Sequence, residues 1–280
     1  MFDQLVDSLW AAPLVACMVI VAIHSYLGLH VIAREVIFVD LSLAQMAALG
    51  STVAILFGAE PDSRLAFAYA LLTTTVGAAL FALSRSRGPG RVPQEAIIGI
   101  VYVVASAAAI LVADQAPRGG EAIKDILVGS LLWVGWPAIG RMAAVYIVVG
   151  LFHYFLRHRF LTISFDPEAA AASGWRLRLW DFWFYLSFGI VITFSVPIVG
   201  VLLVFSFLVV PAAIAFQFTR RRGHLTVIAW FAGVLASAGG IGVSFRYDLP
   251  TGPLVVCVFG ALLLLSYLMR VAFGRDLAAA

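Results

Sequence analysis

Charged residues are scarce in this sequence. They make up 12% of its 280 residues, whereas apolar residues make up 63% and the mean hydropathy is +1.03. A typical soluble domain has about 25% charged and about 45–50% apolar residues. A soluble protein this apolar could not cover its surface with polar groups, so the composition indicates an integral membrane protein. No polar stretch is long enough to build a large soluble domain beside a single membrane anchor.

Lysine is almost absent, since Lys124 is the one lysine among 18 basic residues. A P-loop needs a glycine-rich turn followed directly by lysine and then serine or threonine. Lys124 lies between Ile123 and Asp125 and has no such turn before it. The chain is therefore not a P-loop ATPase, and we expect ATP hydrolysis only in a partner subunit. The sequence also has no HExxH or GxSxG motif, so it predicts a protein that is not itself an enzyme.

Cysteine is rare as well, and both cysteines, Cys17 and Cys257, lie inside apolar runs. Two such cysteines favour packing over a disulfide framework. No Cys/His spacing of a structural zinc site is present. The net charge of +3 gives no reason to expect nucleic acid as a partner.

Long apolar runs make up most of the sequence. A membrane-spanning helix needs about 20 consecutive, mostly apolar residues. The charge-free stretch 182–218 holds 37 residues. As one helix it would be about 55 Å long, so we expect a turn near Pro197 and Gly200. The stretch 123–136 has only 14 residues and predicts a short re-entrant or interfacial helix. The predicted fold is all-α, a single polytopic transmembrane domain over residues 1–280. Nine spans are predicted, over residues 10–32, 36–58, 64–83, 96–113, 138–156, 181–196, 198–218, 225–243 and 253–271.

The distribution of basic residues predicts the orientation, because cytoplasmic loops carry an excess of Arg and Lys. The nine spans place 13 basic residues on one side and five on the other. The five are Arg64, Arg118, Lys124, Arg141 and Arg246. The N-terminus is then outside and the C-terminus in the cytoplasm. Asp3 and Asp7 lead the chain and no positive region precedes the first apolar run, so we expect no cleaved signal peptide at this start.

A short helix with complete capping signals is predicted on the basic side, over about residues 165–175. Asp166 is a favourable N-cap, and Pro167 suits the first helical position. Glu168 in the first turn favours the positive end of the helix dipole. Four alanines follow, and Gly174 can take the left-handed position after the helix. Helices this short are marginal alone in water. The segment therefore predicts either a docking helix or an ordinary loop helix on the membrane surface.

Five stretches in order resemble one family, the membrane subunits of bacterial zinc/manganese-type ABC importers. The capped helix resembles that family's cytoplasmic coupling segment, and GLHVIAREVIFVDLSLAQMAALG (residues 28–50) its N-terminal motif. KDILVGSLL (residues 124–132) resembles its mid-chain motif. GVLLVFSFLVVPAA (residues 200–213) and DLPTGP (residues 248–253) are similar to its GxLL…PAA helix and its C-terminal turn.

This resemblance implies a permease subunit that works in an ATP-driven importer for a divalent metal ion, zinc or manganese. It implies a dimer with a second permease copy or homologue in the bacterial inner membrane, with membrane lipid around it. It also implies a cytoplasmic ABC ATPase dimer that holds ATP and Mg²⁺, and an extracytoplasmic solute-binding protein that delivers the metal. No cofactor is expected on this chain. The residues expected to couple it to the ATPase are Phe165, Asp166, Glu168 and Gly174.

The second predicted span departs from the family at its expected metal ligands. The family's motif is D-A-L-S-H, whose Asp and His are four apart and share one helix face. Such residues suit zinc or manganese. In this chain both ligand positions, Val39 and Leu43, are aliphatic. The neighbouring Asp40 has Leu43 and Ala44 at the i+3 and i+4 positions, so no local partner could chelate with it.

Asp40 is nevertheless the one candidate metal ligand in this span. Ionisable residues inside a span are costly and functional by default, so Asp40, Ser42 and Gln45 are candidates for the transport pathway. The alternative is that Asp40 lies near the cytoplasmic end and meets water or Arg34. The absence of the Asp/His pair leaves three alternatives. In the first, other helices supply the metal ligands; in the second, the cargo is a metal complex or another small solute; in the third, the solute-binding protein selects the cargo.

The other polar residues near the spans are expected to have local roles. His24 and His30 are six apart and cannot chelate from one helix face. Asp181 is expected to pair with Arg178 or to cap its own helix. An ion-coupled secondary transporter, the second class considered, would need further carboxylates within the spans. Three histidines are expected at the cytoplasmic interface: His153, His158 and His224.

Overall fold

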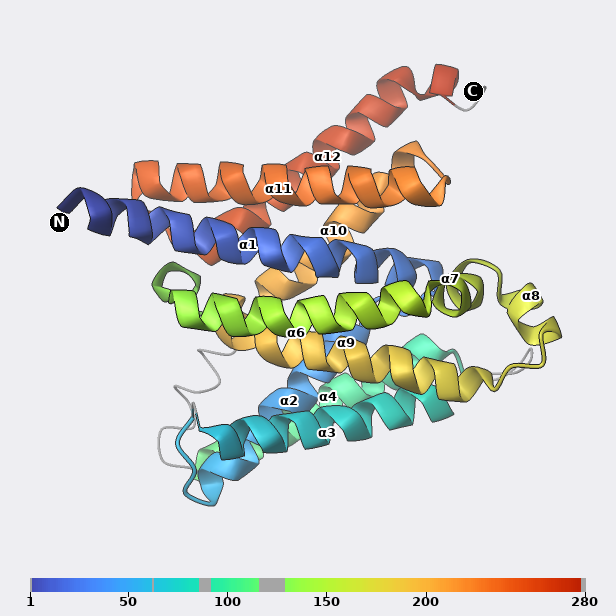
Figure 1. Ribbon diagram of the computed structural model, residues 1–280, viewed down its shortest axis with the longest axis horizontal. Coiled ribbons are helices and arrows are strands. Elements are labelled where there is room, and N and C mark those ends of the chain that lie inside the picture. Colours follow the sequence, from blue (N-terminus) through green and yellow to red (C-terminus); the bar gives the residue numbers. More distant parts are fainter. Residues whose placement is uncertain (1, 62, 86–91, 116–128, 278–280) are drawn as a thin grey trace.

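The computed structural model describes residues 2–61, 63–85, 92–115 and 129–277 (Figure 1). These residues form α-helices, one 3-10 turn and no strand, so the predicted all-α fold is confirmed. The first helices are α1 (Phe2–Ala33), α2 (Val39–Leu56), α3 (Arg64–Leu83), α4 (Gln94–Gln115) and α6 (Trp136–Phe155). The rest are α7 (Arg157–Phe165), α8 (Pro167–Ala172), α9 (Leu177–Val199), α10 (Val201–Phe218), α11 (Arg222–Tyr247) and α12 (Thr251–Leu277).

Nine of the described helices are long and apolar enough to cross a membrane. They match the nine predicted spans, and no end differs by more than four residues. The turn that divides the long apolar stretch lies at Gly200, where φ is +76°, because glycine takes that conformation without strain. Pro197 lies inside the last turn of α9 rather than in the turn itself.

The predicted re-entrant helix falls partly on residues 123–128, which lie outside the described residues. Its described remainder contains a 3-10 turn, η1 (Leu131–Trp133), and α6 begins at Trp136. The N–H of Ser130 donates to the carbonyl of Ile198 at 3.0 Å, which fixes this segment to the end of α9.

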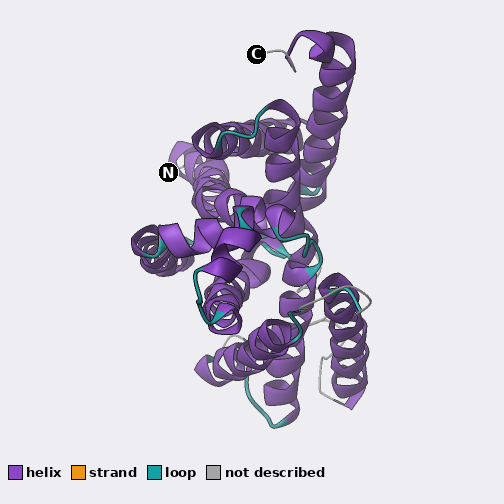
Figure 2. Ribbon diagram, turned by 90° about the vertical axis from the view of Figure 1, so that its right-hand side faces the viewer, coloured by secondary structure: helices purple, strands orange, loops and turns teal. Residues whose placement is uncertain are grey.

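The helices form two packed groups, which α9 joins (Figures 1 and 2). In one group α2 packs against α3 and α4, and in the other α1, α11 and α12 pack around α10. Helix α9 contacts α2 and α3 on one side and α6 and α10 on the other. A displacement that passes between the two groups therefore has α9 as its main route.

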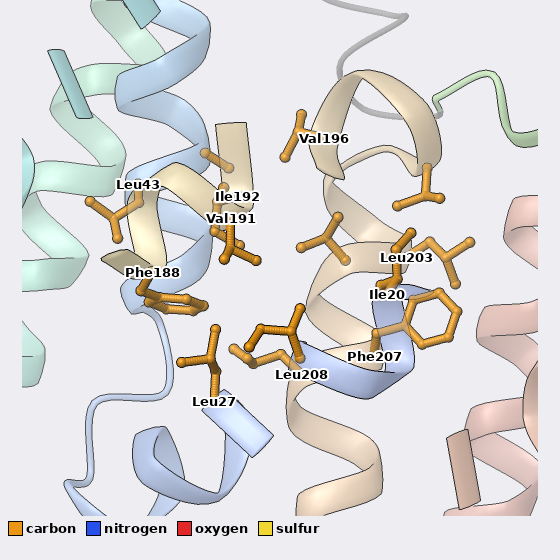
Figure 3. Packing of buried hydrophobic residues seen from close by; sticks show 14 of the residues in the cluster. Ile20, Leu27, Leu43, Phe188, Val191, Ile192, Val196, Leu203, Phe207 and Leu208 are labelled. Atoms are coloured by element: carbon orange, nitrogen blue, oxygen red, sulfur yellow. The ribbon is translucent and has the colours of Figure 1, made fainter. Parts of the chain in front are cut away.

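The apolar core lies where α1, α2, α9 and α10 meet (Figure 3). Leu27, Leu43, Phe188 and Leu208 are each completely buried there. At Gly28, a Cβ atom would lie 1.9 Å from the carbonyl oxygen of Leu208, so α1 and α10 meet backbone to backbone. Small residues allow such approaches in membranes, where close packing contributes more than the hydrophobic effect.

The outer helices show large apolar side chains to their surroundings. In α4 and α12 only 22% and 17% of the span residues are buried. Leu111 is 70% exposed and Leu264 is 60% exposed. An apolar periphery of this kind suits a hydrocarbon environment, in which helices satisfy their own backbone groups.

Candidate functional site

The predicted capped helix is present as α8, at the end of the bundle where α7 projects (Figure 1). The Oδ1 atom of Asp166 accepts a hydrogen bond from the N–H of Ala169 at 3.1 Å. The hydroxyl of Ser173 donates to the carbonyl of Ala169 at 2.7 Å. Gly174 has φ +68°, as expected for the residue after such a helix. The structure differs in one detail, since Phe165 ends α7 and lies outside α8.

Phe165 anchors the start of this segment in the helix bundle. Its ring stacks on Phe216 of α10 with centroids 6.4 Å apart, and it meets the ring of His30 of α1 edge-on at 5.8 Å. The guanidinium of Arg222, at the start of α11, lies 5.3 Å from the centre of the Phe165 ring. Glu168, by contrast, is exposed on α8. The segment 165–174 therefore joins a packed inner end to an open outer end.

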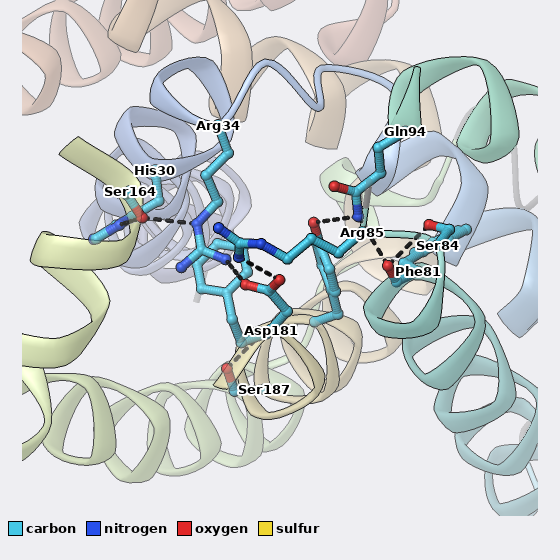
Figure 4. A network of polar contacts seen from close by, with 11 residues as sticks. His30, Arg34, Phe81, Ser84, Arg85, Gln94, Ser164, Asp181 and Ser187 are labelled. Carbon is cyan, nitrogen blue, oxygen red and sulfur yellow. Dashed lines mark hydrogen bonds and ion pairs between the residues drawn. The ribbon is translucent and has the colours of Figure 1, made fainter. Parts of the chain in front are cut away.

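Directly before Phe165, Ser164 enters a buried polar network with α1 and α9 (Figure 4). Its hydroxyl oxygen accepts from Nε of Arg34 at 2.7 Å and lies 2.8 Å from Nδ1 of His30. Arg34 also donates from Nη1 to Oδ1 of Asp181 at 2.9 Å. Arg85, which follows α3, donates to the other carboxylate oxygen at 2.5 Å. We call Arg34, Arg85 and Asp181 the charged clasp.

The prediction for Asp181 was wrong. Asp181 neither pairs with Arg178 nor caps its own helix, but forms ion pairs with Arg34 and Arg85. Its side chain is 2% exposed, and Arg178 is exposed on the surface. Burial lowers the pKa of Arg34 from its ordinary value, and the carboxylate of Asp181 opposes that change. A buried carboxylate between two guanidinium groups is thus held by charge partners from the segments that follow α1 and α3.

His153 also differs from expectation, because it is buried rather than interfacial. Its Nε2 atom lies 2.8 Å from the hydroxyl of Ser187, and its ring stacks on Phe160 at 4.4 Å. His158 and His224 are exposed, as expected. The sequence places His153 near a span end, but packing of α7 on α6 and α9 covers it.

Asp40, Ser42 and Gln45 all lie on α2, but they do not share one face. At about 100° per residue, Asp40 is about 160° from Ser42 and about 140° from Gln45 around the helix. Asp40 is 1% exposed, and its Oδ1 atom has no hydrogen-bond partner. Arg34 gives its hydrogen bonds to Ser164 and Asp181 instead. Ser42 is buried, also without a partner, and Gln45 is half-buried.

Metal-ligating side chains do not gather within the described ranges. No group of three or more His, Cys, Asp and Glu residues there could hold a metal ion. The aliphatic Val39 and Leu43 are both completely buried. Asp40 remains the candidate ligand on α2.

The sequence alone did not predict the role of Ser164, the ion pairs of the charged clasp, or the hydrogen bond between Glu95 and Phe38. The sequence signal for the ion pairs was weak. Asp181 is an acidic residue at the edge of a long apolar run on the basic side. That pattern marks a residue in need of a charge partner, but the partners come from distant segments.

The described helices form a polytopic all-α membrane protein with a short capped helix, α8, at one end of the bundle. The model of the ABC 3 transport family matches residues 2–270. The chain belongs to this family.

Known relatives agree with this assignment. The chain is 27% identical over 271 residues to the manganese transport system membrane protein MntC of Halalkalibacterium halodurans, covering 95% of this chain and 89% of the relative. It is 24% identical to a "probable metal transport system membrane protein" of Chlamydia trachomatis, of which the match covers 62%. In fold it resembles PsaBC of Streptococcus pneumoniae, solved with a Fab. The TM-score is 0.77 over 95% of each chain, at 19% identity.

Proposed function

We propose that the chain is the permease subunit of an ATP-driven importer for a divalent metal ion, manganese or zinc. The observation that carries this proposal is the capped segment 165–174, which is packed into the bundle at Phe165 and open at Glu168. Relatives named for manganese transport support the cargo class. In this reading the nine spans form the passage and the energy comes from outside the chain.

The coupling residues are Phe165, Asp166, Glu168 and Gly174. Asp166 and Gly174 hold the short helix in shape, and Phe165 connects it to α1, α10 and α11. Glu168 is free to meet a partner surface. Closure of an ATPase dimer would shift the population between inward-open and outward-open states through this segment.

The partners of this subunit are a cytoplasmic ABC ATPase dimer, a second permease copy or homologue, and an extracytoplasmic solute-binding protein. ATP and Mg²⁺ belong to the ATPase, and this chain binds no cofactor. It lies in the bacterial inner membrane with its N-terminus outside and its C-terminus in the cytoplasm. The positions of the termini at opposite ends of the bundle, with α8 at the C-terminal end, support that orientation (Figure 1).

A second cargo, a metal complex or another small solute, is favoured by one observation. The family's Asp/His pair is replaced by the buried Val39 and Leu43, and no cluster of metal ligands forms in the described part of the chain. A complexed metal would not need protein ligands along the passage.

Both cargoes are tested with the complex purified through a tag on this chain and reconstituted in proteoliposomes. An ATPase should copurify, and ATP should drive uptake of free Mn²⁺ or Zn²⁺ against a gradient. If the ions are taken up only when a small chelating molecule binds them, the cargo is a metal complex and not the free ion. Accumulation without any ATPase present would contradict the proposal.

Asp40→Asn should lower metal uptake about tenfold, equivalent to about 1.4 kcal/mol, without lowering stability. The carboxylate is buried with an unpartnered oxygen, so the fold gains nothing from its charge. Uptake and thermal unfolding are measured together. Glu60→Gln, a matched change at an exposed acid after α2, is the control. Unchanged uptake and metal selectivity in Asp40→Asn would remove this residue from the cargo path.

A further inference from the structure

Helix α2 has an N-terminal cap that comes from a different helix. Its N-cap residue, Phe38, has no side chain able to accept a hydrogen bond. The Oε1 atom of Glu95, in the first turn of α4, accepts from the N–H of Phe38 at 2.9 Å. A carboxylate at a helix start satisfies a free N–H and favours the positive end of the dipole. Glu95 thus fixes the cytoplasmic end of α2 to α4.

The neighbouring residue Gln94 fixes the start of α4 in turn. Its Nε2 group donates to the carbonyl of Phe81 in α3 at 2.8 Å and to the hydroxyl of Tyr185 in α9 at 3.1 Å. The ring of Tyr185 also packs edge-on against Phe81, with centroids 5.9 Å apart. The start of α4 is therefore tied directly to α9, and the start of α2 is tied to it through Glu95.

On α9, Tyr185 lies one helical turn after Asp181, the centre of the charged clasp. Figure 4 shows Gln94, Arg85, Asp181, Arg34 and Ser164 in one network. Ser164 directly precedes the coupling segment. A path thus runs from Ser164 through the charged clasp to Asp181, along one turn of α9 to Tyr185, by a hydrogen bond to Gln94, and along the α4 backbone to Glu95, which holds the start of α2.

This path links elements that belong to different packed groups. Helix α7 packs on α1, α6, α8 and α9, whereas α2 packs mainly on α3 and α4. Helix α2 also carries Asp40, Ser42 and Gln45. The path gives the coupling segment a connection across α9 to that helix. Its links are hydrogen bonds between separate elements, one turn of α9 and one step along α4.

We infer that Glu95 is a positioning residue, the far end of a polar relay that transmits displacement of the coupling segment to α2. The relay consists of Ser164, the charged clasp, Tyr185, Gln94 and Glu95. This inference rests on the proposed function, because the displacement comes from an ATPase. Glu95 acts by holding the start of α2, without contact with the cargo.

The test uses the complete complex in proteoliposomes, with spin labels at two exposed positions, Ala171 on α8 and Phe57 after α2. The exposed Cys257 is replaced by serine in every sample. The label distance is measured with and without ATP and needs no cargo. The variants are Glu95→Ala, Glu95→Gln and Glu95→Asp, with Glu60→Ala as the matched control. ATP hydrolysed per ion imported is the second readout.

Glu95→Ala should abolish the ATP-dependent change in label distance and raise ATP use per ion at least threefold. Glu95→Gln keeps an oxygen acceptor for the Phe38 N–H and should restore most of the wild-type values. Should Glu95→Ala fail to fold, Glu95→Asp, whose carboxylate is drawn back by one methylene, should show the same loss in part. A wild-type change in label distance and wild-type ATP use per ion in Glu95→Ala would overturn the relay. If Glu95→Ala does not fold, the same result in Glu95→Asp would overturn it.

A double-variant cycle separates the relay from independent local damage. Changes at distant independent sites usually add in free energy. If Ser164 and Glu95 lie on one path, Ser164→Ala combined with Glu95→Ala should raise ATP use no more than the stronger single change. Multiplied effects would contradict the inference. If ATP does not change the label distance in the wild-type complex, the proposed function itself is refuted. If ATP changes the distance in Glu95→Ala as it does in the wild type, only the relay is refuted.

Discussion

Asp181→Asn should lower the free energy of unfolding by about 3–5 kcal/mol, the cost of breaking a buried ion pair by removing one partner. Asp181 is 2% exposed and accepts from Arg34 at 2.9 Å and from Arg85 at 2.5 Å. Asparagine keeps one acceptor oxygen but removes the negative charge. Two guanidinium groups then face each other across the site without compensation, and that of Arg34 is 7% exposed.

Thermal unfolding in detergent measures this effect, and Asp248→Asn, at an exposed acid after α11, is the matched control. Asp181→Glu keeps the charge and should retain most of the stability. The triple change of Asp181, Arg34 and Arg85 to leucine removes all three charges and should recover part of the loss, because apolar side chains can replace a buried ion pair. An Asp181→Asn protein as stable as the control would contradict the structural role of the clasp.

Gly174→Val should lower ATP-driven uptake at least tenfold and leave the fold nearly intact. Gly174 has φ +68°, and no atom lies within 4 Å of a Cβ built there. The effect is therefore conformational, since a left-handed residue with a Cβ costs about 1–2 kcal/mol and a β-branched one is a severe outlier. Helix α8 has six residues and little stability of its own, so losing this turn displaces the coupling surface.

Uptake, transport-coupled ATPase activity and the unfolding temperature are measured on the same preparation. Gly174→Asn is the control, because asparagine tolerates the left-handed region and should keep much of the activity. Normal coupled ATPase activity in Gly174→Val would count against the assignment of residues 165–174 as the coupling segment.

The features that could be predicted from the sequence are those that depend on neighbours along the chain. The nine spans follow from runs of apolar residues, and all their ends lie within four residues of the structure. The cap of α8 also follows from local order, because Asp166, Pro167 and Gly174 lie within nine residues. The turn at Gly200 was predicted for the same reason.

The buried polar contacts could not be predicted in this way. Arg34 and Asp181 are 147 residues apart, Arg85 and Asp181 are 96 apart, and Phe38 and Glu95 are 57 apart. The sequence predicts that Asp181 pairs with Arg178 or caps its own helix, and that His153 lies at the membrane interface. Both assignments failed because charge and hydropathy patterns say that a residue needs a partner, without saying which helix supplies it.

The sequence by itself determined that the chain carries no P-loop, and it predicted the capped helix α8 and the nine helices that are long and apolar enough to cross a membrane in the described ranges. Each of these depends on composition or on contacts within a few residues. Only the tertiary structure decided that Asp40 is buried with an unpartnered Oδ1 atom, that Asp181 joins two arginines, and that Glu95 caps α2. Those outcomes depend on how helices distant in the chain pack together, and packing brings into contact side chains that no local pattern connects.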